Sequence, residues 1–121
     1  MKWLLDTCVV SEIKRPHPAA AVVQWLQNHD EQTAICMVTV GEILHGIERM
    51  PPSAGRNSLQ SWFELLHHRY AKRTFATDEP VWRNFARLKA SLEAIGRRQE
   101  DFDILIAATA SAHGLTLVTR N

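Results

Sequence analysis

Apolar and polar residues follow two spacings along this chain, and the two spacings alternate. Short, continuous apolar runs predict buried strands at residues 2–6, 33–38, 73–76 and 115–119. Between them, apolar residues recur every three or four positions, which predicts helices at residues 7–15, 19–29, 39–50, 58–72, 78–96 and 101–112. Strands without polar alternation, separated by helices, are typical of parallel sheets covered on both faces. The pattern therefore predicts one α/β domain, residues 1–121, with a central, mostly parallel sheet in an α/β/α sandwich.

Prolines, glycines and small polar residues mark the boundaries of these elements. Pro16 and Pro18 end the first helix, and the run from Pro51 to Gly55 predicts the clearest loop. Thr77 or Asp78 is expected to cap the helix that follows it. The last helix stops at Gly114, so it leads directly into the final strand.

Composition narrows the class of protein. A length of 121 residues permits one compact domain with a real core. Fourteen Lys and Arg against thirteen Asp and Glu give a net charge of +1, so contact with a polyanion must depend on local patches. Cys8 and Cys36 lack CxxC spacing, which favours free thiols in a reducing compartment. The N-terminal apolar run is too short for a signal peptide or membrane span, so a cytoplasmic protein is expected.

Three acidic residues lie next to predicted strands in a way that suggests a common site. Asp6 ends the first strand, Glu42 lies in the helix after the second, and Asp103 opens the helix before the last. Ligands bind at the carboxyl ends of parallel strands, so we expect these carboxylates to gather there. Clustered carboxylates repel one another, and a divalent cation offsets that repulsion. Oxygen ligands without His or Cys favour Mg²⁺ or Mn²⁺ over Zn²⁺.

Each acid also has a purely structural interpretation, which the sequence leaves open. Asp6 precedes a helix and is a candidate N-cap. Thr39 and Glu42 fit the S/T-x-x-E capping box, in which the glutamate bonds back to the amide of the threonine. Asp101 and Asp103 both suit the first turn of a helix, where negative charge complements the helix dipole.

Three segments carry a resemblance to a known family: LLDTCVVSE near the start, TVGEILHGIE in the middle and DFDILIAATASAHGLTLVTRN at the end. In this order they resemble the PIN-domain ribonucleases, specifically the VapC-type toxins of bacterial toxin–antitoxin pairs. The resemblance covers the whole chain, and the closing motif is its most specific part. It implies a compact α/β/α domain, cleavage of RNA that depends on Mg²⁺ or Mn²⁺, inhibition by a cognate antitoxin, and a homodimer.

By motif position, the resemblance assigns the catalytic and metal-binding roles to Asp6, Glu42 and Asp103, with Asp101 in reserve. The sequence departs from the family pattern at two places. Cys8 stands where the family often has Asn, so a polar contact is missing there. The family often has a further Asp at or just beyond the position of Asn121, where this sequence stops. Either the chain is cut short or three acids must suffice.

Other residues acquire expected roles from this mechanism, which is metal-assisted hydrolysis of a phosphodiester. Thr7 and Thr119 are expected to hydrogen-bond the carboxylates or bound waters. Arg120 is a candidate contact to the substrate phosphate. The candidate groove for the RNA backbone consists of basic residues, namely Arg69, Lys72, Arg73, Arg97 and Arg98. The candidate groove for a partner helix consists of apolar residues that also suit the core, namely Ile43, Ile47, Trp62 and Phe63.

Three other functions compete with this one. A haloacid-dehalogenase-like phosphatase is disfavoured because Asp6 has no second acid two residues later. Dinucleotide binding is disfavoured because no GxGxxG follows the first strand. The main alternative is a catalytically weak or inactive PIN-fold interaction module that binds an antitoxin or another copy of itself. That alternative predicts no metal binding by the three acids and no nuclease activity.

Overall fold

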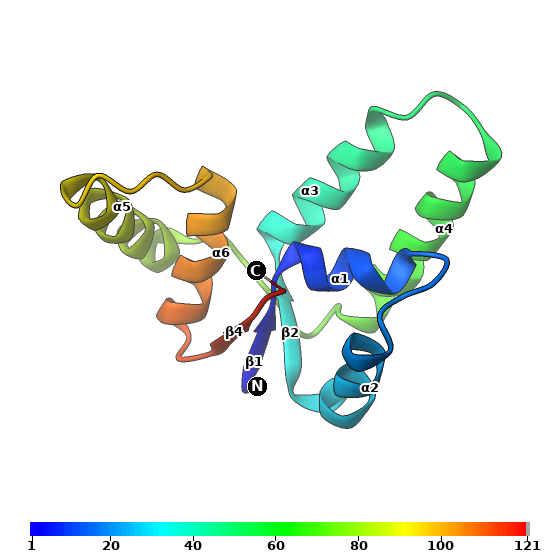
Figure 1. Ribbon diagram of the computed structural model, residues 1–121, viewed down its shortest axis with the longest axis horizontal. Helices are drawn as coiled ribbons and strands as arrows, with labels where there is room; N and C mark the ends of the chain where they lie inside the picture. The colour runs from blue at the N-terminus through cyan, green and yellow to red at the C-terminus, as the bar shows by residue number, and fades with distance from the viewer. Residues whose placement is uncertain (121) are drawn as a thin grey trace.

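The chain forms a four-stranded parallel sheet flanked by helices, as the computed structural model shows for residues 1–120 (Figure 1). The strand order is β3-β2-β1-β4, and every pair is parallel. In chain order the elements are β1 (Trp3–Leu5), α1 (Thr7–Lys14), α2 (Ala20–His29), β2 (Thr33–Cys36), α3 (Met37–Glu48), α4 (Ala54–Arg69), β3 (Thr74–Phe75), α5 (Glu79–Ala94), α6 (Asp101–Ala112) and β4 (Thr116–Val118). A short 3-10 helix, Asp30–Gln32, joins α2 to β2. The predicted α/β class and parallel sheet are confirmed.

Successive residues of the strands point to opposite faces of the sheet and enter two hydrophobic clusters. Leu5 and Ile35 belong to a cluster with residues of α1 to α4, whereas Leu4 and Cys36 pack in a cluster with Ile106 of α6. All four strand side chains are fully buried. Burial of a large aliphatic side chain contributes about 1.5–3 kcal/mol, so helices on both faces stabilise the sheet.

The register of the sheet brings the ends of β1 and β4 to the same level. Leu5 pairs with Val118, and the amide of Asp6 donates to the carbonyl of Val118 at 2.9 Å. Asp6 and Thr119, which follow these strands, therefore emerge side by side at the carboxyl edge. The chain leaves β2 at Cys36 on the same edge and enters α3 at once.

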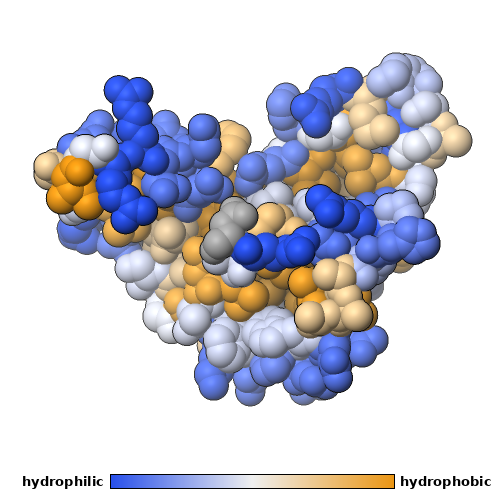
Figure 2. Space-filling view, viewed as in Figure 1, coloured by the Kyte–Doolittle hydropathy of each residue, from blue (hydrophilic) through white to orange (hydrophobic). Residues whose placement is uncertain are grey.

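The helices rise on both sides of this edge. In Figure 1, α3 and α4 project on one side, α5 and α6 on the other, and the end of β4 lies between them. Figure 2 shows the same region as a notch between two lobes of the surface. No helix within residues 1–120 has the length and apolarity that a membrane span requires.

Two helices begin earlier than the sequence predicted. α3 begins at Met37, because the chain turns into the helix directly after extended Cys36. α4 begins at Ala54 rather than Ser58, because the hydroxyl of Ser53 accepts from the Arg56 amide at 3.1 Å and caps the helix. The cap of α5 is Asp78, whose carboxylate accepts from Val81 at 3.4 Å. Both cysteines are free thiols, as predicted.

Candidate active site

Asp6 lies at the N-cap position of α1, but its side chain does not cap the helix. Its backbone carbonyl accepts from the amides of Val9 and Val10, and no amide of the helix bonds to its carboxylate. Instead Oδ2 accepts hydrogen bonds from Thr119 Oγ1 at 2.9 Å and from Cys8 Sγ at 3.4 Å. The capping interpretation therefore does not account for this carboxylate, which faces the end of β4.

Glu42 lies in the second turn of α3 and does not form the capping box that the sequence left open as an alternative. The helix begins two residues before Thr39, which is fully buried and lies inside α3. Glu42 Oε1 accepts from Thr7 Oγ1 at 2.7 Å, and Thr7 Oγ1 lies 2.9 Å from Thr39 Oγ1. Because Thr7 donates its one hydroxyl proton to Glu42, Thr39 must donate to Thr7. Glu42 is thus bonded to the residue that follows Asp6.

Asp103 lies in the first turn of α6 and is electrostatically coupled to Asp6. Although the side chain is exposed, its partial burial raises the pKa of Asp103, and the negative charges of Asp6 and then Glu100 raise it further. Asp101 is different, because its carboxylate bonds to Lys89 Nζ on α5 at 2.9 Å. The fold therefore couples Asp103, and not the reserve candidate Asp101, to Asp6.

The donors at this edge suit a hard divalent cation. They are carboxylate oxygens, and the interaction between Asp6 and Asp103 is repulsive. Within residues 1–120, no Lys or Arg forms an ion pair with Asp6, Glu42 or Asp103. In the same residues, no three His, Cys, Asp or Glu side chains converge as a metal-binding group. Two coupled aspartates, with Glu42 hydrogen-bonded to Thr7, the residue after Asp6, offer oxygen donors of the kind that Mg²⁺ or Mn²⁺ prefers.

Comparison with known proteins connects this geometry to a family. The PIN domain profile matches residues 3–121. The chain belongs to the PIN-domain family. Three relatives each align with 98% of the chain and 86% of their own length: plasmid stability protein StbB of Pseudomonas syringae pv. tomato (36% identical), toxin FitB of Neisseria gonorrhoeae (34%) and VapC ribonuclease Y4jK of Sinorhizobium fredii (32%). The crystal structure of FitAcB from Neisseria gonorrhoeae superposes with a TM-score of 0.90 at 34% identity, covering 98% of this chain and 87% of that one. The resemblance to VapC-type PIN domains is confirmed.

The hydroxyl groups expected to bond the acids of this PIN domain do so. Thr7 donates to Glu42, and Thr119 donates to Asp6. Two further contacts were not foreseen from the sequence, those of Thr39 and Cys8. The sequence offered Thr39 only as a candidate helix cap, and Cys8 as a lost polar contact. The thiol of Cys8 in fact reaches the carboxylate of Asp6, so the contact is changed in kind and not lost.

Arg120 of the PIN domain forms an ion pair with Glu12 in α1. The phosphate contact predicted for Arg120 therefore stays a prediction, and its guanidinium already has a protein partner. Glu12 itself is 3% exposed, whereas the neighbouring Ile13 is 37% exposed. Glu12 lies three residues after the apolar residue Val9, and this spacing was the available signal that both side chains share the inward face of α1. Asn121, the other position discussed at the end of the sequence, lies outside the described residues.

The predicted groove of five basic residues is wrong as a single surface. Arg69 pairs with Asp30 at 2.6 Å, and Arg73 donates to the carbonyl of Thr33 at 2.9 Å, at the amino end of β2. Both therefore lie at the edge of the sheet opposite the acids. Arg97 and Arg98 instead line a polar pocket of about 620 Å³ between the end of α5 and the start of α6.

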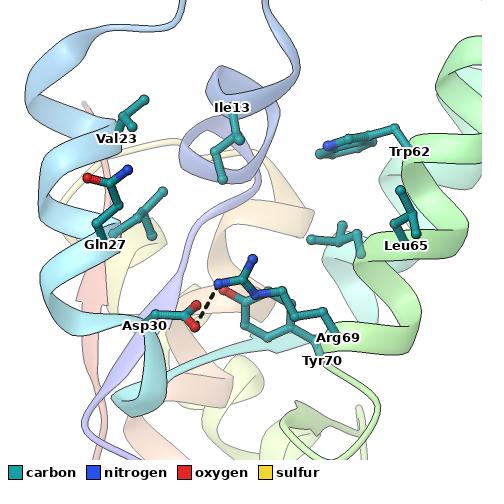
Figure 3. A pocket seen from close by; sticks show the side chains of 10 residues that line it. Ile13, Val23, Gln27, Asp30, Trp62, Leu65, Arg69 and Tyr70 are labelled. Atoms are coloured by element: carbon teal, nitrogen blue, oxygen red, sulfur yellow. Dashed lines mark ion pairs between the residues drawn. The ribbon is translucent and has the colours of Figure 1, made fainter.

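The predicted partner groove also needs correction. Ile43, Ile47 and Phe63 are buried in the core and cannot line a surface, whereas Trp62 is only partly buried. An apolar pocket of about 380 Å³ does lie between α1, α2 and α4. Its labelled lining in Figure 3 is Ile13, Val23, Gln27, Asp30, Trp62, Leu65, Arg69 and Tyr70, with the Asp30–Arg69 ion pair at one end.

Proposed function

We propose that this PIN domain is a divalent-metal-dependent endoribonuclease that acts as the toxin of a toxin–antitoxin pair. The observation that carries the proposal is the coupling of Asp6 and Asp103 at the carboxyl edge of the sheet, with Glu42 linked to the same edge through Thr7. The names of the relatives, a toxin and a VapC ribonuclease, support the same assignment. A cytoplasmic location follows from such a substrate and partner.

Asp6, Asp103 and Glu42 would hold the cation, which we expect to be Mg²⁺ or Mn²⁺. When bound, such a cation supplies a polarised phosphodiester and a water of lowered pKa. The residues of the chain would determine where the cation is held. Thr119 fixes the carboxylate of Asp6, and Thr7 fixes that of Glu42, so two of the three acids are oriented by hydroxyl donors. Asp103 adds charge from the N-terminus of α6, where the helix dipole favours anions.

The partner is proposed to be a cognate antitoxin that covers the apolar pocket of α1, α2 and α4. Leu65 is 73% exposed at this pocket, and an exposed leucine beside partly buried Trp62 suits an apolar side chain of a partner. The Asp30–Arg69 pair at the rim supplies polar contacts. A homodimer remains a proposal that rests on the family resemblance.

The nuclease proposal is tested by incubating the purified chain with a mixed RNA pool, with Mn²⁺ or with EDTA, and mapping the cut sites. Cleavage should need the cation and should be lost in Asp6→Asn and Asp103→Asn. The matched control is Asp101→Asn, which changes the same side chain two residues away and leaves Asp6 untouched. Cleavage in EDTA, or full cleavage by Asp103→Asn, would reject the proposal.

The second candidate is the inactive interaction module. The observation in its favour is that no three acidic, His or Cys side chains converge within residues 1–120. It predicts that the wild-type chain neither cleaves RNA nor binds Mn²⁺ while still binding its partner. Calorimetry with Mn²⁺ on the wild-type chain therefore separates the two functions before any RNA is added.

A further inference from the structure

Glu12 is a buried carboxylate that the proposed reaction does not use. Its side chain faces inward from α1 and ties together three parts of the chain. Oε2 accepts from the amide of Ala19, before α2, at 3.0 Å. Oε1 pairs with Arg15 at 3.4 Å and with Arg120 beyond β4. A buried carboxylate is stable only where such partners replace water, so these contacts fix Glu12 and the segments it joins.

Arg120 directly follows the residue that orients Asp6. Thr119 donates to Asp6 Oδ2 at 2.9 Å, and β4 ends one residue earlier, at Val118. A cavity of about 170 Å³ lies between this segment and α2, lined in part by Trp25, Thr119 and Arg120. Packing therefore supports the segment only in part, and the buried end of the Glu12–Arg120 pair anchors it.

We propose that Glu12 and Arg120 are positioning residues, whose ion pair holds Thr119 so that its hydroxyl donates to Asp6. Glu12 contacts neither substrate nor metal and acts through Arg120 and Thr119. Arg120 then anchors the chain after β4 to the buried carboxylate of Glu12. The effect on the cation rests on the proposed function, in which Asp6 is a ligand, whereas the effect on the position of Thr119 does not.

The first test compares Glu12→Gln, Thr119→Val and the double variant in the full chain. Mn²⁺ affinity, measured by calorimetry, should fall roughly tenfold in each single variant, the low end of losses seen when a residue behind a metal ligand is removed. The double variant should lose no more, because both changes remove the same contact to Asp6. The control is Glu48→Gln, an exposed glutamate paired with Arg56 at 3.5 Å, which should bind Mn²⁺ like the wild type. Unchanged affinity in Glu12→Gln, or losses that multiply in the double variant, would overturn the proposal.

The second test needs neither metal nor RNA. Cys8 Sγ lies 3.4 Å from Asp6 Oδ2 and 3.7 Å from Thr119 Oγ1, so its alkylation reports on the position of Thr119. In EDTA, Glu12→Gln should raise the rate at which iodoacetamide modifies Cys8 several-fold, and Glu48→Gln should leave it unchanged. An unchanged rate would show that Glu12 only stabilises the fold. Absence of Mn²⁺ binding in the wild type would reject the metal site alone. The alkylation rate of Cys8 would still test whether the Glu12–Arg120 ion pair positions Thr119.

A third variant keeps the proposal testable if Glu12→Gln fails to fold. Arg120→Gln removes the same ion pair from its partly exposed end, since the Arg120 side chain is 43% exposed. It should reproduce both the faster alkylation of Cys8 and the weaker binding of Mn²⁺. Arg120→Lys keeps the charge that faces Glu12, so it should restore part of both values. Equal alkylation rates and equal Mn²⁺ affinities in the Gln and Lys variants would count against a role for the ion pair in positioning Thr119.

Discussion

Two aspartates in the first turn of α6 should respond in opposite ways when each is changed to Asn. Asp101 bonds to Lys89 at 2.9 Å, and a negative charge at a helix N-terminus contributes about 0.3–1 kcal/mol. In EDTA at neutral pH, Asp101→Asn should lower the free energy of unfolding by at least that contribution. Asp103→Asn loses the same dipole term but also removes the repulsion from Asp6. Its stability should therefore stay level or rise.

The gain in stability expected for Asp103→Asn agrees with the upward shift of the pKa of Asp103. Asp103 has a higher pKa in the folded chain than in the unfolded chain, so folding favours its protonated form. The associated stability is fully present below the unfolded pKa and is lost as pH rises through the folded pKa. The advantage of Asp103→Asn over the wild type should therefore be largest at neutral pH, and shrink as the pH falls through the folded pKa of Asp103 toward its unfolded pKa.

Adding Mn²⁺ should reverse the order of stability of the two variants. A ligand at about 100 times its Kd stabilises the folded state by about 2.7 kcal/mol, and this increment should remain in Asp101→Asn and vanish in Asp103→Asn. Urea unfolding of the wild type and the two variants, in EDTA and in Mn²⁺, measures the free energy of unfolding of each protein in each condition. Equal increments in the two variants, or a loss confined to Asp101→Asn, would refute the assignment of Asp103.

Three further outcomes are expected. Glu42→Gln keeps an acceptor for Thr7, so stability should change by less than about 1 kcal/mol while Mn²⁺ affinity and RNA cleavage collapse together; retained cleavage would restrict Glu42 to a structural role. Ser53→Ala removes the cap of α4 and should cost about 1 kcal/mol in urea unfolding, and no loss would mean that Ser53 does not stabilise the helix. In native protein, mass spectrometry should find Cys8 alkylated before Cys36, because burial excludes reagent from Cys36 and raises the pKa of its thiol; equal rates would contradict the buried placement.

The helices and strands themselves were predictable from the sequence, because the spacing of their apolar residues shows which side chains are buried. Within residues 1–120, the four strands and six main helices follow from hydrophobic spacing, since continuous apolar runs encode strands buried on both faces and a spacing of three or four encodes one buried helix face. Element ends were less predictable. Thr39 satisfies the letter pattern of a cap, yet α3 already begins at Met37, because Cys36 ends β2 without any loop. The pattern does not encode how abruptly the preceding strand stops.

The site was predictable as a set of acids and not as a set of contacts. Asp6 and Asp103 could be placed together because strand order and helix entry bring them to one edge. The contact between Glu12 and Arg120 joins residues 108 positions apart, and no local pattern specifies it. The same is true of Arg69, whose charge suggested RNA although Asp30 neutralises it at the far edge of the sheet. Charge alone does not show which partner the fold provides.

The hydroxyl groups around the acids determine how much of the site is ordered before a cation binds. Thr119 donates to Asp6, and Thr7 donates to Glu42, so folding has already restricted both carboxylates. Restricting a glutamate costs up to about 1.5–2 kcal/mol of side-chain entropy, which the cation then need not supply. Asp103 accepts no side-chain hydrogen bond from any residue in the described part of the chain, and its charged form is disfavoured. Crystals soaked with Mn²⁺ should therefore show the carboxylate of Asp103 reoriented and those of Asp6 and Glu42 almost unmoved. A large rotation of Glu42 with Asp103 unmoved would contradict this order of events.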